Sequence, residues 1–110
     1  MAEELLIFKK FYSFVLLIYP VINRIPKSHR LVLGREIELV SLVILTSIIR
    51  ANKTQCLIRK NIQGKISQNI DTLRILLRLT KDLKFMSVGQ YSVLVEKLNE
   101  IAKMLYSWSR

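Results

Sequence analysis

The sequence has very few of the residues from which metal centres and active sites are built. It contains one cysteine and one histidine, and only eight aspartate and glutamate residues in 110. A single cysteine excludes an intrachain disulfide, and with one histidine it leaves no ligand set for structural zinc. No glycine-rich phosphate loop, Ser-His-Asp set or reliable carboxylate pair is present. We therefore expect no cofactor, no metal site and no enzymatic activity, and a reducing, cytoplasmic location.

Strand patterns, internal repeats and low-complexity segments are also absent from the sequence. Apolar positions instead recur every three to four residues between short turns, and 51% of the residues are hydrophobic, which is ample for a core. The pattern predicts one all-α domain over residues 1–110, folded as an up-down-up-down four-helix bundle. The expected helices cover about residues 3–23, 29–53, 56–84 and 88–108.

Single residues mark several of the expected helix ends. Pro20 predicts a kink or fraying near the end of the first helix, and Ser28 is the expected N-cap of the second. Ser87, followed three residues later by Gln90, has the form of a capping box at the start of the fourth helix. The apolar helical neighbours of Cys56 predict a buried or half-buried thiol rather than a reactive one.

Two apolar segments raise the question of whether the chain contains a signal peptide or a membrane span. Phe11 to Ile22 resembles a signal peptide, but Glu3 and Glu4 precede it and no small-residue cleavage site follows. Leu39 to Ile49 is about half the length of the roughly 20 apolar residues that a membrane span requires. Because this second segment is apolar around most of a helix, it predicts a subunit interface. We expect a homo-oligomer and no membrane partner.

Positive charge is the main functional signal. Eighteen lysine and arginine residues give a formal net charge of +10, which attracts polyanions such as nucleic acid. Arg74, Arg78 and Lys81 share one helix face, where few acidic residues are interspersed. Basic stripes without aromatic residues between them favour contacts with the phosphate backbone. The candidate contact residues are Arg24, Lys27, Arg30, Arg59, Lys60, Arg74, Arg78, Lys81 and Lys84.

An enzymatic interpretation rests on the spacing of Arg24 and His29. The pattern R-x4-H occurs in small helical ribonucleases that need no metal, where the pair activates a ribose hydroxyl and stabilises the phosphorane charge. In this sequence Pro26 interrupts the pattern within an early turn. A structural or binding role for His29 is therefore favoured over nuclease activity.

Three segments resemble one known family. They are Arg24-Ile-Pro-Lys-Ser-His-Arg30 with Leu33-Gly34, Leu76-Leu-Arg-Leu-Thr-Lys-Asp-Leu-Lys84 with Ser87 and Gln90-Tyr91, and Leu98-Asn-Glu-Ile-Ala-Lys-Met-Leu105 with Trp108. In order and spacing they are similar to the accessory variability determinant, Avd, of diversity-generating retroelements. A family of four-helix bundles encoded in intervening sequences of bacterial ribosomal RNA genes shares much of the same pattern.

The resemblance to Avd implies a pentameric barrel of four-helix bundles that binds the reverse transcriptase of the element and nucleic acid, both RNA and DNA. Such a protein supports mutagenic reverse transcription and retrohoming but does no chemistry. By matching positions, the resemblance implies contact roles for Arg24, His29, Arg30, Arg78, Lys81 and Lys84. The alternatives are an RNA-binding protein of the ribosomal intervening-sequence type, the helical ribonuclease and a peripheral membrane protein.

Overall fold

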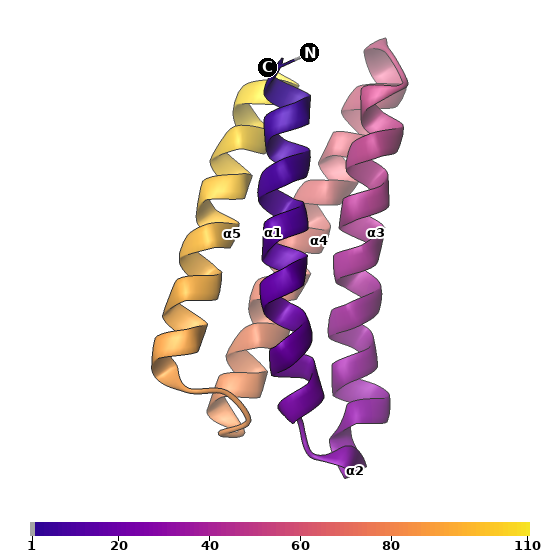
Figure 1. Cartoon of the computed structure of the whole chain (residues 1–110). Coiled ribbons are helices and arrows are strands. Elements are labelled where there is room, and N and C mark those ends of the chain that lie inside the picture. Colours follow the sequence, from indigo (N-terminus) through magenta and orange to yellow (C-terminus); the bar gives the residue numbers. More distant parts are fainter. Residues whose placement is uncertain (1) are drawn as a thin grey trace.

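The computed structural model describes the backbone from Ala2 to Arg110 and the side chains from Leu6 to Arg110. Four long helices form an elongated bundle of 43 × 24 × 19 Å, and no strand occurs in the described backbone (Figure 1). The helices are α1 (Ala2–Arg24), α3 (Arg35–Asn52), α4 (Cys56–Asp82) and α5 (Val88–Ser109). Both α1 and α4 pack between α3 and α5, so helices that follow one another in the chain are neighbours in space. The predicted four-helix bundle is confirmed.

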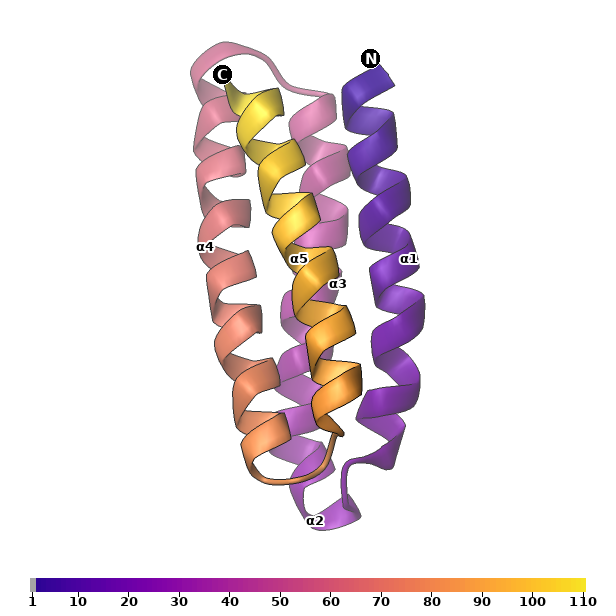
Figure 2. The ribbon, with the colours of Figure 1, turned by 90° about the vertical axis from the view of Figure 1, so that its left-hand side faces the viewer.

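The two ends of the bundle carry different connections. The chain termini and the turn between α3 and α4 lie at one end, and the segment around α2 and the loop between α4 and α5 lie at the other (Figures 1 and 2). Successive helices therefore run in opposite directions. This topology brings the first turn of the chain to the same end as the α4–α5 loop.

The core is built from branched aliphatic side chains and two stacked aromatic rings. Phe11 and Phe14 are fully buried on α1, with ring centroids 5.4 Å apart. On α4 the buried residues fall at three- and four-residue intervals, as an amphipathic helix requires: Ile62, Ile66, Ile70, Leu73 and Leu77. Leu94, Leu98, Ile101 and Leu105 complete the core from α5. One apolar stripe from each helix therefore accounts for the bundle.

The second helix begins differently from the prediction, which was one continuous helix from residue 29. A short turn, α2 (Lys27–His29), and a π-helical segment, η1 (Arg30–Gly34), precede α3. The carbonyl of Pro26 accepts hydrogen bonds from the backbone of His29 and Arg30, so the helical path starts at the proline. Ser28 lies inside α2 and makes no cap, so its predicted N-cap role is wrong.

Gly34 lets η1 approach α1 closely. The glycine is buried, and a Cβ atom added to it would lie 3.2 Å from Cγ of Arg30 and 3.4 Å from Cγ2 of Ile22. A larger side chain would push these neighbours apart, because interior contacts of this kind leave little free space.

The structure contradicts fraying at Pro20 and burial of Cys56, whereas a kink at Pro20 stays a prediction. Helix α1 continues through the exposed Pro20 to Arg24, so it does not fray at the proline. Cys56 is exposed rather than buried, and it begins α4 with a φ of 56°. Leu57 and Ile58 in the same turn are 81% and 64% exposed. The first turn of α4 therefore lacks a packing partner, which sequence periodicity does not reveal.

The start of α5 agrees with the sequence. The backbone N–H of Gln90 donates to Oγ of Ser87 over 3.0 Å, and the backbone N–H of Ser87 donates to Oε1 of Gln90 over 3.2 Å. The predicted capping box is confirmed.

The most apolar stretch of described helix is Leu6–Arg24, which by length and composition is the one segment long and apolar enough to cross a membrane. Within it Phe11, Phe14 and Ile18 are fully buried between the other helices. The core of the bundle therefore explains part of its apolar character, because 39% of the segment is buried while Leu6, Leu16 and Leu17 are exposed.

Candidate nucleic-acid interface

The first turn and the α4–α5 loop meet at one end of the bundle. The imidazole of His29 lies against the ring of Phe85, with centroids 5.1 Å apart and ring planes inclined by 36°. This contact places the cations of the first turn beside those at the end of α4. We call this surface the basic end and define it by five cations: Arg24, Lys27, Arg30, Lys81 and Lys84.

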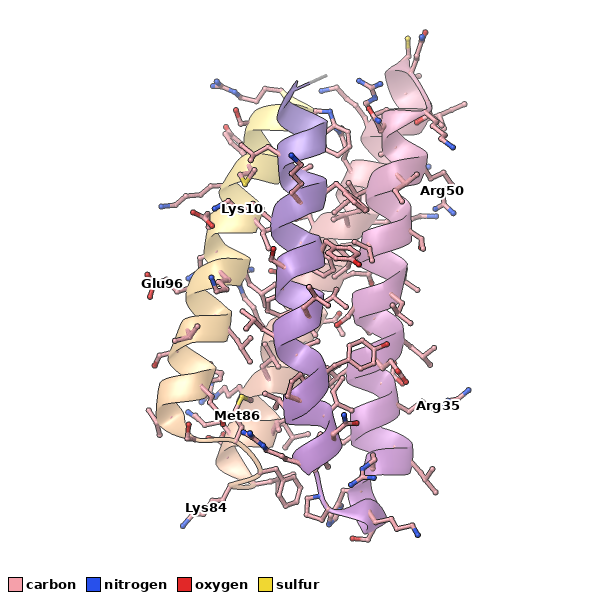
Figure 3. All side chains as sticks on the ribbon, in the orientation of Figure 1. Lys10, Arg35, Arg50, Lys84, Met86 and Glu96 are labelled. Carbon is pink, nitrogen blue, oxygen red and sulfur yellow. The ribbon has the colours of Figure 1, made fainter. Side chains whose placement is uncertain are left out.

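Lys84 occupies an unusual backbone position within the basic end. Its φ is 67°, in the left-handed region where glycine is normally found. The N–H of Phe85 donates to the carbonyl of Thr80, and the N–H of Lys84 donates to that of Lys81, which together form a Schellman motif. Figure 3 shows the Lys84 side chain pointing away from the bundle. An exposed amine therefore stands where glycine would give the more stable turn.

Arg30 is held by backbone carbonyls at the end of α1. Its Nε and one terminal nitrogen donate to the carbonyl of Ile25 over 3.2 and 3.1 Å, and the terminal nitrogen also donates to that of Asn23 over 2.9 Å. These carbonyls have no partner within the helix, and a cation is favoured at a helix C-terminus. Arg30 therefore caps α1, and its positive charge remains at the basic end.

Arg59 and Lys60 lie at the opposite end of the bundle, where each also binds carbonyls. Arg59 donates from Nε to the carbonyls of Ala51 and Thr54, both over 3.0 Å, and its guanidinium carbon lies 5.9 Å from the centre of the Trp108 ring. Lys60 donates to the carbonyl of Ser109 over 2.8 Å. These two candidates are therefore separate from the basic end.

Three cations in the C-terminal half of α4 are paired with the two acidic residues of that helix. Arg74 contacts Asp71 over 2.7 Å and also donates to Oδ1 of Asn99 on α5. Arg78 lies 3.8 Å and Lys81 3.2 Å from oxygens of Asp82. Much of the charge on this predicted stripe is therefore balanced locally.

Four of the five cations of the basic end have no acidic partner within the described side chains. One of them, Arg30, is held by backbone carbonyls, and the other three, Arg24, Lys27 and Lys84, are exposed. Phosphates can contact these side chains without breaking an ion pair. Each such contact releases counterions from the nucleic acid, which favours binding.

The structure offers little support for catalysis by Arg24 and His29. No hydrogen bond joins the two residues in the described chain, and His29 packs against Phe85 instead. No group of three or more histidine, cysteine, aspartate or glutamate residues suited to a metal ion occurs among the described side chains.

Sequence reasoning missed the role of Phe85. The sequence pattern leaves Phe85 between the expected helices 56–84 and 88–108, whereas the structure shows that it joins this turn to His29. No local sequence signal pairs two residues in different loops, because the contact depends on how the bundle closes.

The model of the bAvd-like family matches residues 5–110, nearly the whole chain. The chain belongs to the bAvd-like family. The resemblance to the accessory variability determinant is therefore confirmed, and it rests on the full bundle rather than on one motif.

A solved structure also resembles the bundle. It is the crystal structure of a protein of unknown function from the S23 ribosomal protein family of Bacteroides thetaiotaomicron VPI-5482, which matches with a TM-score of 0.85 over 97% of both chains. The sequences are 16% identical, so this likeness shows a common fold alone. The comparison with curated proteins found no match.

Proposed function

We propose that this member of the bAvd-like family is a non-enzymatic accessory protein of a diversity-generating retroelement. It binds the reverse transcriptase of the element and nucleic acid, and so supports mutagenic reverse transcription and retrohoming. The observation that carries this proposal is the basic end, where two distant parts of the chain present unpaired cations together. Family membership supplies the biological setting.

The basic end supports contact with phosphates rather than reading of base sequence. Lys27 and Lys84 are flexible point charges, and Arg24 is exposed near them at the end of α1. Contacts of this kind position RNA or cDNA and are strongly salt-dependent, but they carry little sequence information. A cytoplasmic protein that holds template RNA near the polymerase needs this form of recognition.

The outer face of α3 supports assembly into a homo-oligomer. Ile37, Ile44 and Ile48 are buried on the inner side of the helix, while apolar residues on the outer side are 37% to 47% exposed: Leu39, Leu42, Val43 and Ile49. Contiguous exposed apolar residues mark interaction surfaces. A second copy covers this face in our proposal, and the resemblance to Avd implies a closed ring of five.

Co-purification with the reverse transcriptase encoded beside the gene tests the proposal, and light scattering gives the mass of the free protein. We expect a stable complex and a mass of about five protomers. Val43→Glu should lower that mass, because burying a carboxylate in an apolar interface is unfavourable. The control is Glu96→Gln, at an exposed position of α5. A monomeric wild-type protein that binds no reverse transcriptase would contradict the proposal.

A further inference from the structure

An open groove between α4 and α5 lies near the C-terminal end of α5, far from the basic end. Its volume is about 270 Å³, just below the roughly 300 to 1,000 Å³ of typical small-molecule sites. The polar residues that line it come from both helices: Lys60, Gln63, Ser67, Tyr106 and Ser109. The groove has room for one nucleotide-sized group rather than an extended ligand.

The amide of Gln63 lacks a partner in this groove. Gln63 is only 2% exposed, and its Nε2 makes no hydrogen bond in the described structure. A buried donor without an acceptor destabilises a protein, and native structures rarely retain one without a reason. The nitrogen is closed off from solvent, so the amide has to turn toward the groove before an oxygen atom of a ligand there supplies the missing acceptor.

The other polar groups of the groove also favour an anionic ligand. The ammonium group of Lys60 uses one of its donors on the carbonyl of Ser109, over 2.8 Å, which holds it at the groove edge with further donors free. Ser67 adds a hydroxyl, and none of the described lining residues is acidic. Amine, amide and hydroxyl donors around one space form a set that matches the oxygens of a phosphate.

Tyr106 provides an aromatic surface next to these donors. It lines the groove and is 68% exposed, and the guanidinium carbon of Arg110 lies 5.8 Å from the centre of its ring. Exposed aromatic rings beside cations stack on the bases of single strands. The sequence pattern predicts nucleic-acid contacts by basic residues alone, so Tyr106 is not among the candidate residues named from the sequence.

We propose that the groove binds one nucleotide of single-stranded RNA, with the phosphate at Lys60 and Gln63 and the base on Tyr106. This inference rests on the proposed nucleic-acid-binding function and adds a second contact to it. Helix α5 has 22 residues, so about 30 Å separates the groove from the basic end. A strand held at both ends would follow the length of the bundle.

Gly64 allows the groove to be filled without disturbing the fold. A Cβ atom added to it meets no other atom within 4 Å, and replacing a helical glycine raises helix propensity. Gly64→Leu therefore blocks the groove in a folded protein. Thr72→Leu, at an exposed position of the same helix, places a leucine outside the groove and is the control.

The experiment measures the affinity of a fluorescein-labelled single-stranded oligouridine RNA, and of a strand of the same length that lacks bases. We expect Gly64→Leu to weaken RNA binding about tenfold and Thr72→Leu to bind like the wild type. Tyr106→Leu should remove most of the preference for RNA over the strand without bases.

Two results would overturn the inference while the proposed function stands. One is RNA binding by Gly64→Leu equal to that of the wild type, and the other is an unchanged preference for RNA in Tyr106→Leu. A wild-type protein that binds neither strand would refute both the groove and the nucleic-acid-binding function.

Discussion

His29 and Phe85 lie against each other with ring centroids 5.1 Å apart, and this contact joins the first turn to the α4–α5 loop. Aromatic pairs of this geometry contribute about 0.5 to 1.5 kcal/mol beyond the area that they bury. A double-mutant cycle of His29→Ala and Phe85→Ala, measured by chemical denaturation, should give a coupling energy in this range. Additive effects of the two substitutions would mean that the loops are held independently.

Lys84 is expected to lower the stability of the fold while it adds a positive charge to the basic end. Lys84→Gly should raise the free energy of unfolding by about 1 kcal/mol, because glycine adopts a positive φ without the steric penalty of a Cβ atom. The same substitution should weaken RNA binding. Lys84→Gln separates the two effects, since it removes the charge but keeps the Cβ, so it should lose affinity without gaining stability. Equal stability of Lys84→Gly and the wild type would refute this account.

Arg30 is expected to stabilise the bundle as well as to carry charge. Arg30→Ala should lower the free energy of unfolding by roughly 1.5 to 3 kcal/mol, the range for hydrogen bonds to charged groups. Arg30→Lys should recover little, because one amine does not reproduce the guanidinium fork that reaches both Asn23 and Ile25. Lys27→Ala, at an exposed position of the same end, should change stability by less than about 0.5 kcal/mol. Equal losses in the two alanine variants would contradict a capping role.

Tyr19 gives the fold a pH dependence in the alkaline range. Hydrogen bonding to the Glu38 carboxylate, together with burial and the charge of Glu38, raises the pKa of Tyr19 above its ordinary value of 10.0. The native state therefore holds this proton more tightly than the unfolded state. Its contribution to stability is complete below pH 10 and is lost as the pH rises through the native pKa.

Absorbance titration of the tyrosines tests the position of this proton. The wild-type protein should contain one tyrosine that ionises later than an ordinary one, and Tyr19→Phe should remove it. Glu38→Gln should shift the same titration back toward the ordinary pH range. A late titration that persists in Tyr19→Phe would show that another group causes it.

The fold could be predicted from the sequence because the pattern and the local signals agree. Apolar residues such as Ile66 and Leu73 repeat at helical spacing and are buried as a bundle requires. Ser87 and Gln90 form their capping box through contacts three residues apart. Interactions of such short range are visible in a sequence, so helix type and number were accessible.

The start of the second helix and the burial of single residues could not be predicted from the sequence in the same way. Pro26 replaces Ser28 as the start of the turn, because its carbonyl accepts two backbone hydrogen bonds that the sequence does not show. Cys56 has apolar neighbours, yet the turn that contains it lies beyond the packed core. Both outcomes depend on tertiary packing, which the periodicity within one helix does not reveal.

The candidate site was partly predictable for a similar reason. Composition identified the cations, but it did not show which of them are already engaged. Arg74 and Arg78 meet Asp71 and Asp82 within the same helix, whereas Arg59 is turned to the carbonyls that end α3. Lys84 and Lys27 reach the same end of the bundle only when the bundle closes.

The salt dependence of RNA binding tests the basic end most directly. The measurement compares the wild type with a triple variant of the unpaired cations, Arg24→Gln, Lys27→Gln and Lys84→Gln. A second triple variant, Lys10→Gln, Arg74→Gln and Arg78→Gln, removes the same formal charge from cations outside the basic end that each have an acidic partner. We expect the first variant to reduce the slope of log affinity against log salt by about two, and the second to reduce it by less. An unchanged slope in the first variant would contradict the basic end as the nucleic-acid interface.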